Sequence, residues 1–239
     1  MKKKTLILLP GLSRFPLAIM LLLCFLSIIF VAMKSPEKEK YDYLALGDSY
    51  TIGEKVPAEE NFPNQLVRIM REKGKNFSAP RIIATTGWTT GELQAAVTKA
   101  RIRKKYDFVT LLIGVNNQYR GLKVVDYIPE FEKLLQQAIH FAGNDTSHVV
   151  VLSIPDWGVT PFAEGRDRQQ IAKDIDAYNA ANRLITEKYG IHYIDITPGT
   201  RKASSDASLL AEDGLHPSGK AYGEWAAEIG KYILPKTKK

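Results

Sequence analysis

The sequence predicts a three-layer α/β domain in which helices cover both faces of a five-stranded parallel sheet. From residue 41 onward, short segments rich in β-branched and aromatic residues alternate with longer amphipathic segments, as expected of repeated βαβ units. Residues 108–113 and 148–154 are nearly continuous apolar runs, which is typical of parallel strands buried on both faces. The composition, with 45% apolar and 25% charged residues, is that of an ordinary globular chain.

Five segments have the length and composition of strands. They are residues 41–46, 81–85, 108–113, 148–154 and 192–196. Between and after them lie five segments that predict helices, at residues 61–73, 89–101, 126–142, 168–189 and 218–233. The second helix has a start signal, because Thr89 or Thr90 can cap a first turn that contains Glu92.

Around the third predicted helix, apolar residues recur at intervals of three and four, as in an amphipathic helix that packs on a sheet. These residues are Val124, Ile128, Phe131, Leu134, Leu135 and Ala138. The sequence shows no internal repeat and no second domain. The alternation therefore predicts one flavodoxin-like domain over residues 41–239, preceded by a charged linker at residues 35–40.

The N-terminal segment, residues 1–34, is predicted to direct the chain to a membrane. Three lysines and Arg14 precede an uncharged apolar run at residues 15–33. Nineteen helical residues reach about 28 Å, close to the hydrocarbon thickness of a bilayer. A buried core helix is disfavoured, because only Cys24 and Ser27 interrupt the run. An uncleaved anchor fits best, and the alternatives are a cleaved signal peptide and lipidation at Cys24.

The charge distribution and the number of cysteines limit the possible cellular locations of the domain and the classes of partner it can bind. Basic residues before the apolar run predict a cytoplasmic N-terminus and an extracytoplasmic domain, or a secreted or periplasmic one after cleavage. Cys24 is the only cysteine, which excludes a disulfide scaffold. The net charge is +7, of which residues 1–40 contribute +5. The folded domain therefore gives no indication of a nucleic-acid partner.

Ligands of parallel α/β sheets bind beyond the carboxyl ends of the strands, so the loops after residues 46, 85, 113, 154 and 196 are the ones to inspect. The first contains Gly47, Asp48 and Ser49. The glycine allows a sharp turn that places Ser49 at the edge of the sheet. On its own this short pattern is also compatible with a turn in which Asp48 or Ser49 caps a helix.

Near the C-terminus, Asp213 and His216 lie three residues apart in a loop bounded by Gly and Pro. The carboxylate can hold one imidazole nitrogen and leave the other free to accept a proton, as acyl transfer requires. The other three histidines are placed in a helix or at the starts of strands. Gly87 and Asn116 follow the second and third strands and supply an N–H and an amide, the donor types of an oxyanion hole.

The combination Gly47-Asp48-Ser49, Gly87, Gly114-Val115-Asn116 and Asp213-Gly214-Leu215-His216 resembles the SGNH (GDSL-type) hydrolase family over residues 41–233. The resemblance implies a serine ester hydrolase with Ser49 as nucleophile, His216 as general base and Asp213 as its orienting carboxylate. It also implies an oxyanion hole formed by Ser49, Gly87 and Asn116. Two residues differ from many members: Tyr50 stands where the motif name has leucine, and Asn117 where aspartate is frequent.

The substrate is predicted to be an ester of a small molecule, a lipid or a glycan. Tyr50, Trp88, Asn117 and Trp157 are candidates for the pocket wall, and no insertion resembles a lipase lid. The family covers lysophospholipids, thioesters, simple esters and acetylated sugars, and an extracytoplasmic position favours lysophospholipids or O-acetylated glycans. The sequence indicates neither a cofactor nor a metal, because no His/Asp/Glu cluster has ligand spacing. It does not indicate an oligomeric state.

Two rival functions belong to other classes. A non-catalytic α/β module could bind a small ligand or glycan in the same crevice, without needing Ser49, Asp213 and His216 together. A nucleotide- or flavin-binding domain would need a glycine-rich phosphate loop after the first strand. The loop at residues 47–53 matches neither common phosphate-binding pattern, so we retain the binding module as the alternative.

Overall fold

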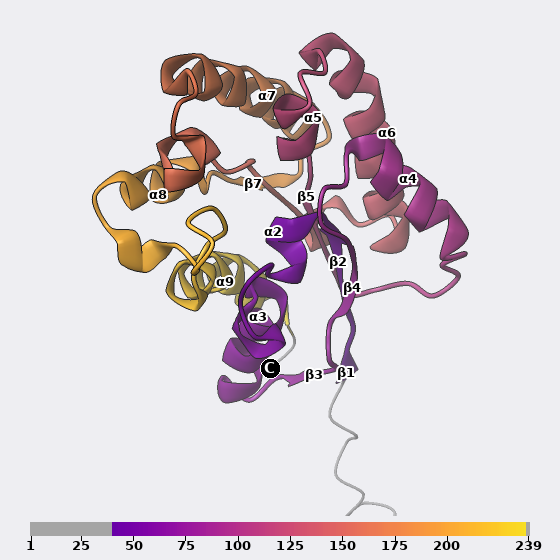
Figure 1. The fold of residues 1–239 in the computed structure, drawn as a ribbon. Coiled ribbons are helices and arrows are strands. Elements are labelled where there is room, and N and C mark those ends of the chain that lie inside the picture. Colours follow the sequence, from indigo (N-terminus) through magenta and orange to yellow (C-terminus); the bar gives the residue numbers. More distant parts are fainter. Residues whose placement is uncertain (1–39, 238–239) are drawn as a thin grey trace, which may run out of the picture. The chain divides into compact units, whose positions relative to one another are not determined.

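The computed structural model describes residues 40–237, whose fold is shown in Figure 1. Within this part of the chain, five strands form one parallel sheet in the order β4-β2-β5-β6-β7. They are β2 (Tyr43–Gly47), β4 (Arg81–Ala84), β5 (Phe108–Leu112), β6 (Val149–Leu152) and β7 (His192–Ile194). Counted along the chain, the order is 2-1-3-4-5, the flavodoxin-like arrangement. The predicted parallel sheet is confirmed.

Within residues 40–237, long helices cover the two faces of this sheet (Figure 1). Helices α3 (Phe62–Glu72) and α9 (Gly219–Ile233) pack together on one face. The other face is covered by α4 (Thr90–Lys99), α6 (Val124–Phe141) and α7 (Arg168–Lys188). All five lie where the sequence predicts helices, within about two residues at each end.

Several short elements add to this framework. The short α-helices are α2 (Ser49–Ile52), α5 (Val115–Tyr119) and α8 (Thr197–Arg201). The 3₁₀ turns are η1 (Ala58–Glu60), η2 (Thr146–His148), η3 (Trp157–Val159), η4 (Pro161–Ala163), η5 (Lys202–Ser204), η6 (Ala207–Leu209) and η7 (Leu234–Lys236). Strands β1 (Lys40–Tyr41) and β3 (Asn76–Phe77) form a separate parallel pair.

The predicted first strand is therefore divided at Asp42. The Asp42 N–H donates to Oδ2 of Asp107 at 2.6 Å, and the Asp107 N–H donates to the Asp42 carbonyl at 2.8 Å. These bonds replace ladder pairing at this residue. The chain changes from pairing with β3 to pairing with β4 and β5.

The core lies on both faces of the central strands. Every residue of β2, β5 and β6 is buried, as their nearly continuous apolar sequences predict. The buried Tyr43 hydroxyl is bonded to Thr110 Oγ1 at 2.7 Å. On α6, Phe131, Leu134 and Leu135 are buried as predicted, whereas Ile128 is 38% exposed.

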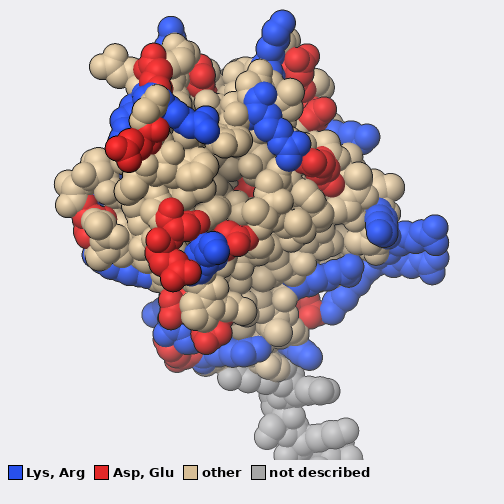
Figure 2. Space-filling model, viewed as in Figure 1, with Lys and Arg blue, Asp and Glu red and all other residues tan. Residues whose placement is uncertain are grey.

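The predicted N-terminal segment at residues 1–34 lies outside the described residues. Within residues 40–237, none of the helices combines the length and apolar character needed to cross a membrane. Figure 2 shows acidic and basic side chains in several groups, separated by wide uncharged areas. This mixture fits the near balance of charge outside residues 1–40.

Candidate active site

A pocket of about 160 Å³ lies at the carboxyl ends of the central strands. It is lined by Ser49, Tyr50, Thr86, Gly87, Val115, Asn116, Tyr119, Trp157, Phe162, Leu215 and His216. Four predicted site residues from four separate loops, Ser49, Gly87, Asn116 and His216, thus meet in one pocket. Parallel strands bring loops distant in sequence to the same edge, which is why these residues meet.

The turn that presents Ser49 depends on Gly47 at the end of β2. A Cβ at Gly47 would lie 2.1 Å from Thr51 Oγ1 and 2.5 Å from the Leu112 carbonyl oxygen, so only glycine fits. Asp48 then caps α2, accepting the Tyr50 N–H at 3.0 Å. Ser49 is the first residue of α2 and is 4% exposed. Its position at the pocket follows from this short strand–turn–helix connection.

Asp48, the neighbour of the pocket residue Ser49, is a fully buried carboxyl group. Burial raises its pKa to about 7, against the opposing effect of hydrogen bonds from the Tyr50 and Asp48 N–H groups and the Asn116 side chain. Its ionisation therefore falls in the neutral range. Asp48 is the N-cap of α2, so of the two residues that the sequence left open for a helix cap, Asp48 and Ser49, it is Asp48 that caps.

Asp213 and His216 are bonded to each other as predicted. The His216 Nδ1 lies 2.6 Å from Asp213 Oδ2, and Asp213 Oδ1 accepts the N–H groups of Leu215 and His216 at 3.1 and 3.0 Å. Burial acts to raise the pKa of Asp213, but the hydrogen bonds from His216 and Leu215 outweigh it and lower the pKa. The ionised carboxylate can only accept, so Nδ1 carries the proton and Nε2 is left as an acceptor.

The imidazole of His216 is held between the Asp213 carboxylate and the ring of Tyr50. The centroids of the Tyr50 and His216 rings are 5.0 Å apart, at an interplanar angle of 50°. Both residues are buried, at 4% and 7% exposure. Tyr50 therefore restricts the orientation of the imidazole, besides lining the pocket.

Gly87 lies in the loop between β4 and α4 with a φ of +82°, in the left-handed region that favours glycine. Its carbonyl accepts a hydrogen bond from Arg120 Nη2 at 2.5 Å. The Gly87 carbonyl is therefore engaged by a side chain from the end of α5. Arg120 is a residue that motif analysis does not single out.

Asn116 lies on α5, directly after the turn at Gly114. Its Nδ2 donates to the Trp88 carbonyl at 3.0 Å and to Asp48 Oδ2 at 3.4 Å. The second bond is long and therefore weak. The amide lines the pocket with one strong and one weak internal partner.

Trp88 and Asn117 are not among the residues that line this pocket. Asn117 is 1% exposed, and it accepts the Thr90 N–H at 3.0 Å and donates to Thr90 Oγ1 at 2.7 Å. It joins α5 to the start of α4. Trp88 packs partly buried against the core. Of the four candidates for the pocket wall, the structure places Tyr50 and Trp157 at the pocket.

Three aromatic rings form one wall of the pocket, which we call the aromatic wall: Tyr119, Trp157 and Phe162. Ring centroids are 5.3 Å apart for Tyr119 and Trp157, 6.0 Å for Trp157 and Phe162, and 6.1 Å for Tyr119 and Phe162. Trp157 is 4% exposed, whereas Tyr119 and Phe162 are each 43% exposed. Of these three residues, the sequence analysis identifies only Trp157. Tyr119 and Phe162 belong to no motif, and only the fold brings them next to Trp157.

The aromatic wall is fixed by polar contacts. Trp157 Nε1 donates to Gln118 Oε1 at 2.7 Å. The Arg166 guanidinium carbon lies 5.2, 5.3 and 5.9 Å from the ring centroids of Tyr119, Trp157 and Phe162, a cation–π geometry. Arg166 is not among the pocket-lining residues, so it supports the wall without lining the pocket.

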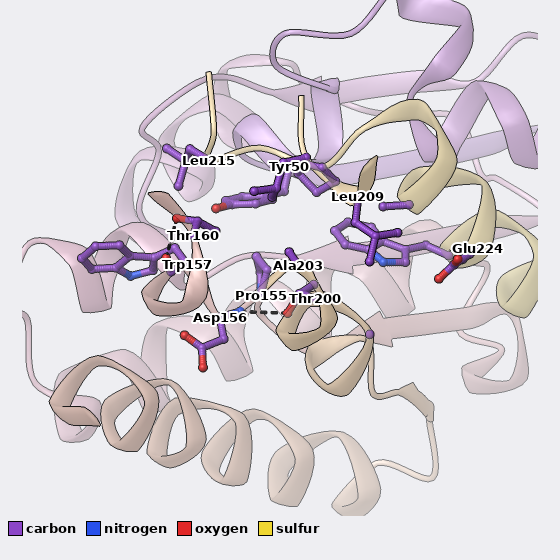
Figure 3. A pocket seen from close by; sticks show the side chains of 15 residues that line it. Tyr50, Pro155, Asp156, Trp157, Thr160, Thr200, Ala203, Leu209, Leu215 and Glu224 are labelled. Atoms are coloured by element: carbon purple, nitrogen blue, oxygen red, sulfur yellow. Dashed lines mark hydrogen bonds between the residues drawn. The ribbon is translucent and has the colours of Figure 1, made fainter. Parts of the chain in front are cut away.

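A second, smaller cavity of about 20 Å³ adjoins the first and shares Tyr50, Trp157 and Leu215 with it (Figure 3). On its far side lie apolar residues such as Leu209. The Asp156 N–H donates to Thr200 Oγ1 at 3.1 Å, which ties the Trp157 loop to α8. Tyr50 thus borders both cavities.

Within residues 40–237, no group of three or more His, Cys, Asp or Glu side chains is arranged to hold a metal ion. The chemistry available at the pocket is that of a hydroxyl, an imidazole and hydrogen-bond donors.

The model of the GDSL-like lipase/acylhydrolase family matches residues 45–223. No curated protein matches the sequence significantly.

Solved structures share the fold at low identity. A lipase/acylhydrolase from Enterococcus faecalis has a TM-score of 0.63 at 21% identity, covering 83% of this chain and 97% of its own. The acetylxylan esterase Axe2 from Geobacillus stearothermophilus has a TM-score of 0.63 at 17% identity, covering 81% and 94%. The esterase EstA from Pseudoalteromonas sp. has a TM-score of 0.63 at 16% identity, covering 82% and 98%.

Proposed function

Because the chain belongs to the GDSL-like lipase/acylhydrolase family, we propose that its pocket hydrolyses carboxylic esters through an acyl-enzyme formed on Ser49. One observation carries this proposal. The His216 Nδ1–H donates to Asp213 Oδ2 at 2.6 Å, which leaves Nε2 as the acceptor, and His216 lines the same pocket as Ser49. A nucleophile, a base and a group that orients the base are thus available together.

The proposed reaction proceeds in two steps. His216 Nε2 takes the Ser49 hydroxyl proton as Oγ attacks the ester carbonyl carbon. The bond to the alcohol breaks, and the departing alkoxide receives that proton from His216. Water then attacks the acyl-enzyme by the same route, which releases the acid and restores the Ser49 hydroxyl. Asp213 keeps the imidazole in the required tautomer throughout.

The negative charge on the carbonyl oxygen is to be stabilised by the Ser49 and Gly87 N–H groups and the Asn116 side chain. Asn116 already donates strongly to the Trp88 carbonyl. Its weaker bond, at 3.4 Å to Asp48, is the one that an oxyanion would replace. Donors held in place before the reaction stabilise the developing charge without reorganisation.

The proposed substrate is an ester with a short acyl group and a ring-containing alcohol, such as an O-acetylated glycan. A cavity of about 160 Å³ has room for a short acyl group beside Ser49, which is why we favour an acetyl ester over a lysophospholipid. The half-exposed rings of Tyr119 and Phe162 offer a face on which a sugar ring can stack. The similar fold of an acetylxylan esterase agrees with this choice.

The proposed location follows from the sequence. Residues 41–239 form the catalytic domain outside the cytoplasm, tethered by an uncleaved apolar segment within residues 1–34 and joined to it by residues 35–40. A secreted or periplasmic domain is the alternative if the segment is cleaved.

The first test uses the full-length chain, purified in mild detergent, with p-nitrophenyl esters from acetate to palmitate. We expect the acetate ester to be hydrolysed fastest. Ser49→Ala should lower kcat by about 10³-fold or more, and a fluorophosphonate should label the wild type only. Circular dichroism checks that the variant is folded. Equal hydrolysis by both proteins would refute the role of Ser49.

The second test separates the two substrate classes. Acetate release from acetylated xylo-oligosaccharides is compared with fatty-acid release from lysophosphatidylcholine at equal ester concentration. We expect the former to be faster. If folded wild type hydrolyses neither and resists the fluorophosphonate, the non-catalytic binding module becomes the better interpretation.

A further inference from the structure

We propose that Arg120 is a positioning residue that holds the Gly87 loop in the conformation its N–H needs to stabilise the oxyanion. This inference rests on the proposed ester hydrolysis and adds a residue to it. Arg120 does not line the pocket. It acts through the backbone of a residue that does.

The Arg120 guanidinium joins the loop to a helix. Nη2 donates to the Gly87 carbonyl at 2.5 Å and lies 3.2 Å from Glu92 Oε2, while Nη1 donates to Glu92 Oε1 at 3.3 Å. Glu92 in turn accepts the Thr89 N–H at 2.8 Å, as part of the capping box of α4. The guanidinium is thus fixed on both sides, as its planar fork allows.

Arg120 also acts together with Asn116. The two residues are four positions apart at α5, which places them on the same side of a helical turn. Asn116 donates to the Trp88 carbonyl at 3.0 Å, and Arg120 donates to the preceding carbonyl, that of Gly87. Two consecutive carbonyls of the loop are therefore held from one short element.

The loop needs such restraint. Gly87 has a φ of +82°, and it follows the exposed residues Thr85 and Thr86. A Cβ at Gly87 would meet one atom within 4 Å, Arg120 Nη2 at 3.8 Å. One backbone bond, from the Trp88 N–H to the Thr85 carbonyl at 3.3 Å, closes the turn. The side-chain hydrogen bonds to the Gly87 and Trp88 carbonyls add the restraint that ties this turn to α5. Rotation of the unrestrained glycine would turn its N–H away from the reacting oxygen.

The expected effect is on kcat. Complete loss of one oxyanion donor typically costs about 10²–10³-fold in kcat. Loosening the loop lets the donor reach its position part of the time, so Arg120→Ala should lower kcat for p-nitrophenyl acetate about 10-fold with KM changed less than about 2-fold. Arg120→Lys keeps a donor for the carbonyl but loses the fork, and should recover part of the loss.

Arg183→Ala is the matched control. Arg183 is also an exposed arginine that pairs with a glutamate, Glu187, at 2.9 Å, but it lies on α7 and does not line the pocket. Exposed ion pairs add little stability, so both alanine variants should unfold at nearly the same temperature as wild type. We expect unchanged kcat for Arg183→Ala.

Chemical rescue distinguishes the proposed positioning role of Arg120 from a purely structural one. Guanidinium ion at millimolar concentration should restore part of kcat in Arg120→Ala, while leaving wild type and Arg183→Ala unaffected. Inactivation by a p-nitrophenyl phosphonate, whose adduct carries the oxyanion, should slow in parallel with kcat.

Failure of the inference and failure of the proposed function give different results. If wild type is active and Ser49-dependent but Arg120→Ala and Arg120→Lys retain full kcat, Arg120 is not a positioning residue and the esterase stands. If wild type lacks Ser49-dependent turnover, the proposed function itself fails. Loss of kcat accompanied by early unfolding of both Arg120 variants would also overturn the positioning role.

Discussion

Asp48 combines a capping role with a protonation that depends on the fold. Its carboxyl group is buried between the Tyr50 N–H and the Asn116 amide, and burial raises its pKa to about 7. In the unfolded chain an aspartate has a pKa of about 3.9. Between these values the folded state keeps a proton that the unfolded state has lost, so the free energy of unfolding must fall as pH rises.

We expect wild type to lose stability between about pH 4 and pH 7, with an upper limit near 4 kcal/mol for three pKa units. Above about pH 7 this contribution becomes constant. Asp48→Asn keeps an oxygen for the cap but cannot ionise, so this decline should disappear. Urea unfolding of both proteins at several pH values measures it.

Asp206→Asn is the control for that comparison. Asp206 also caps a short turn, but it is exposed, and its hydrogen bonds with Ser208 and Lys220 lower its pKa to about 2. Its stabilising effect is lost only as pH falls toward that value. The variant should therefore leave the slope between pH 4 and 7 unchanged. Parallel curves for wild type and Asp48→Asn would contradict the burial argument.

At the scale of elements, the site is assembled from short pieces that long helices and strands hold in place. Helices α2 and α5 have only four and five residues, too few to be stable alone. Gly47 and Gly114 start them, since a Cβ at Gly114 would lie 2.8 Å from the Tyr127 ring. Tight packing at both glycines fixes where Ser49 and Asn116 point.

The aromatic wall, built from α5, η3 and η4, should decide affinity for the alcohol portion of the substrate. We expect Phe162→Ala to raise KM for acetylated xylo-oligosaccharides about 10-fold, because a stacking surface is lost. The kcat should change little. KM for methyl acetate should stay the same, because its alcohol is too small to reach the wall. Steady-state kinetics on the two substrates makes the comparison.

Leu184→Ala serves as the reference substitution for the wall. Leu184 is an exposed apolar residue, at 71% exposure, and it lies on α7 and does not line the pocket. It should leave both KM values unchanged. An equal rise in KM for the glycan and for methyl acetate in Phe162→Ala would instead indicate a general disturbance of the pocket.

At the scale of the whole molecule, the residues proposed for catalysis all lie within residues 40–237, which carry little net charge. Removal of residues 1–34 should therefore leave kcat and the thermal midpoint unchanged, while moving the protein from the membrane fraction to the soluble fraction. An esterase assay of carbonate-washed membranes and of the soluble fraction shows where the protein lies and gives its kcat. Thermal unfolding of the two purified proteins compares their midpoints.

Cys24→Ala in the full-length chain distinguishes the two modes of attachment. An apolar anchor would keep this variant in the membrane fraction, whereas attachment through a lipid on Cys24 would release it. If wild type is already soluble, the anchor proposal fails.

Much of the architecture could be predicted, because it follows from local patterns. The five parallel strands and five long helices were readable from apolar runs and amphipathic spacing, and the Asp213–His216 pair from its spacing of three residues. Trp88 and Asn117 were predicted at the pocket but lie elsewhere, because side-chain direction in a loop depends on backbone angles that no periodicity reveals. The contacts of Arg120 with Gly87 and of Phe162 with Tyr119 join distant residues without a motif.

The site also has a consequence for how the protein is made. His216 comes 167 residues after Ser49 in the sequence. Helix α3 near the beginning packs on α9 near the end, where Gln65 Nε2 donates to the Gly219 carbonyl at 2.7 Å. A nascent chain therefore carries Ser49 without its proposed base until residue 216 has been synthesised. We therefore expect a chain that ends before residue 213 to lack the proposed esterase activity, because it has neither Asp213 nor His216.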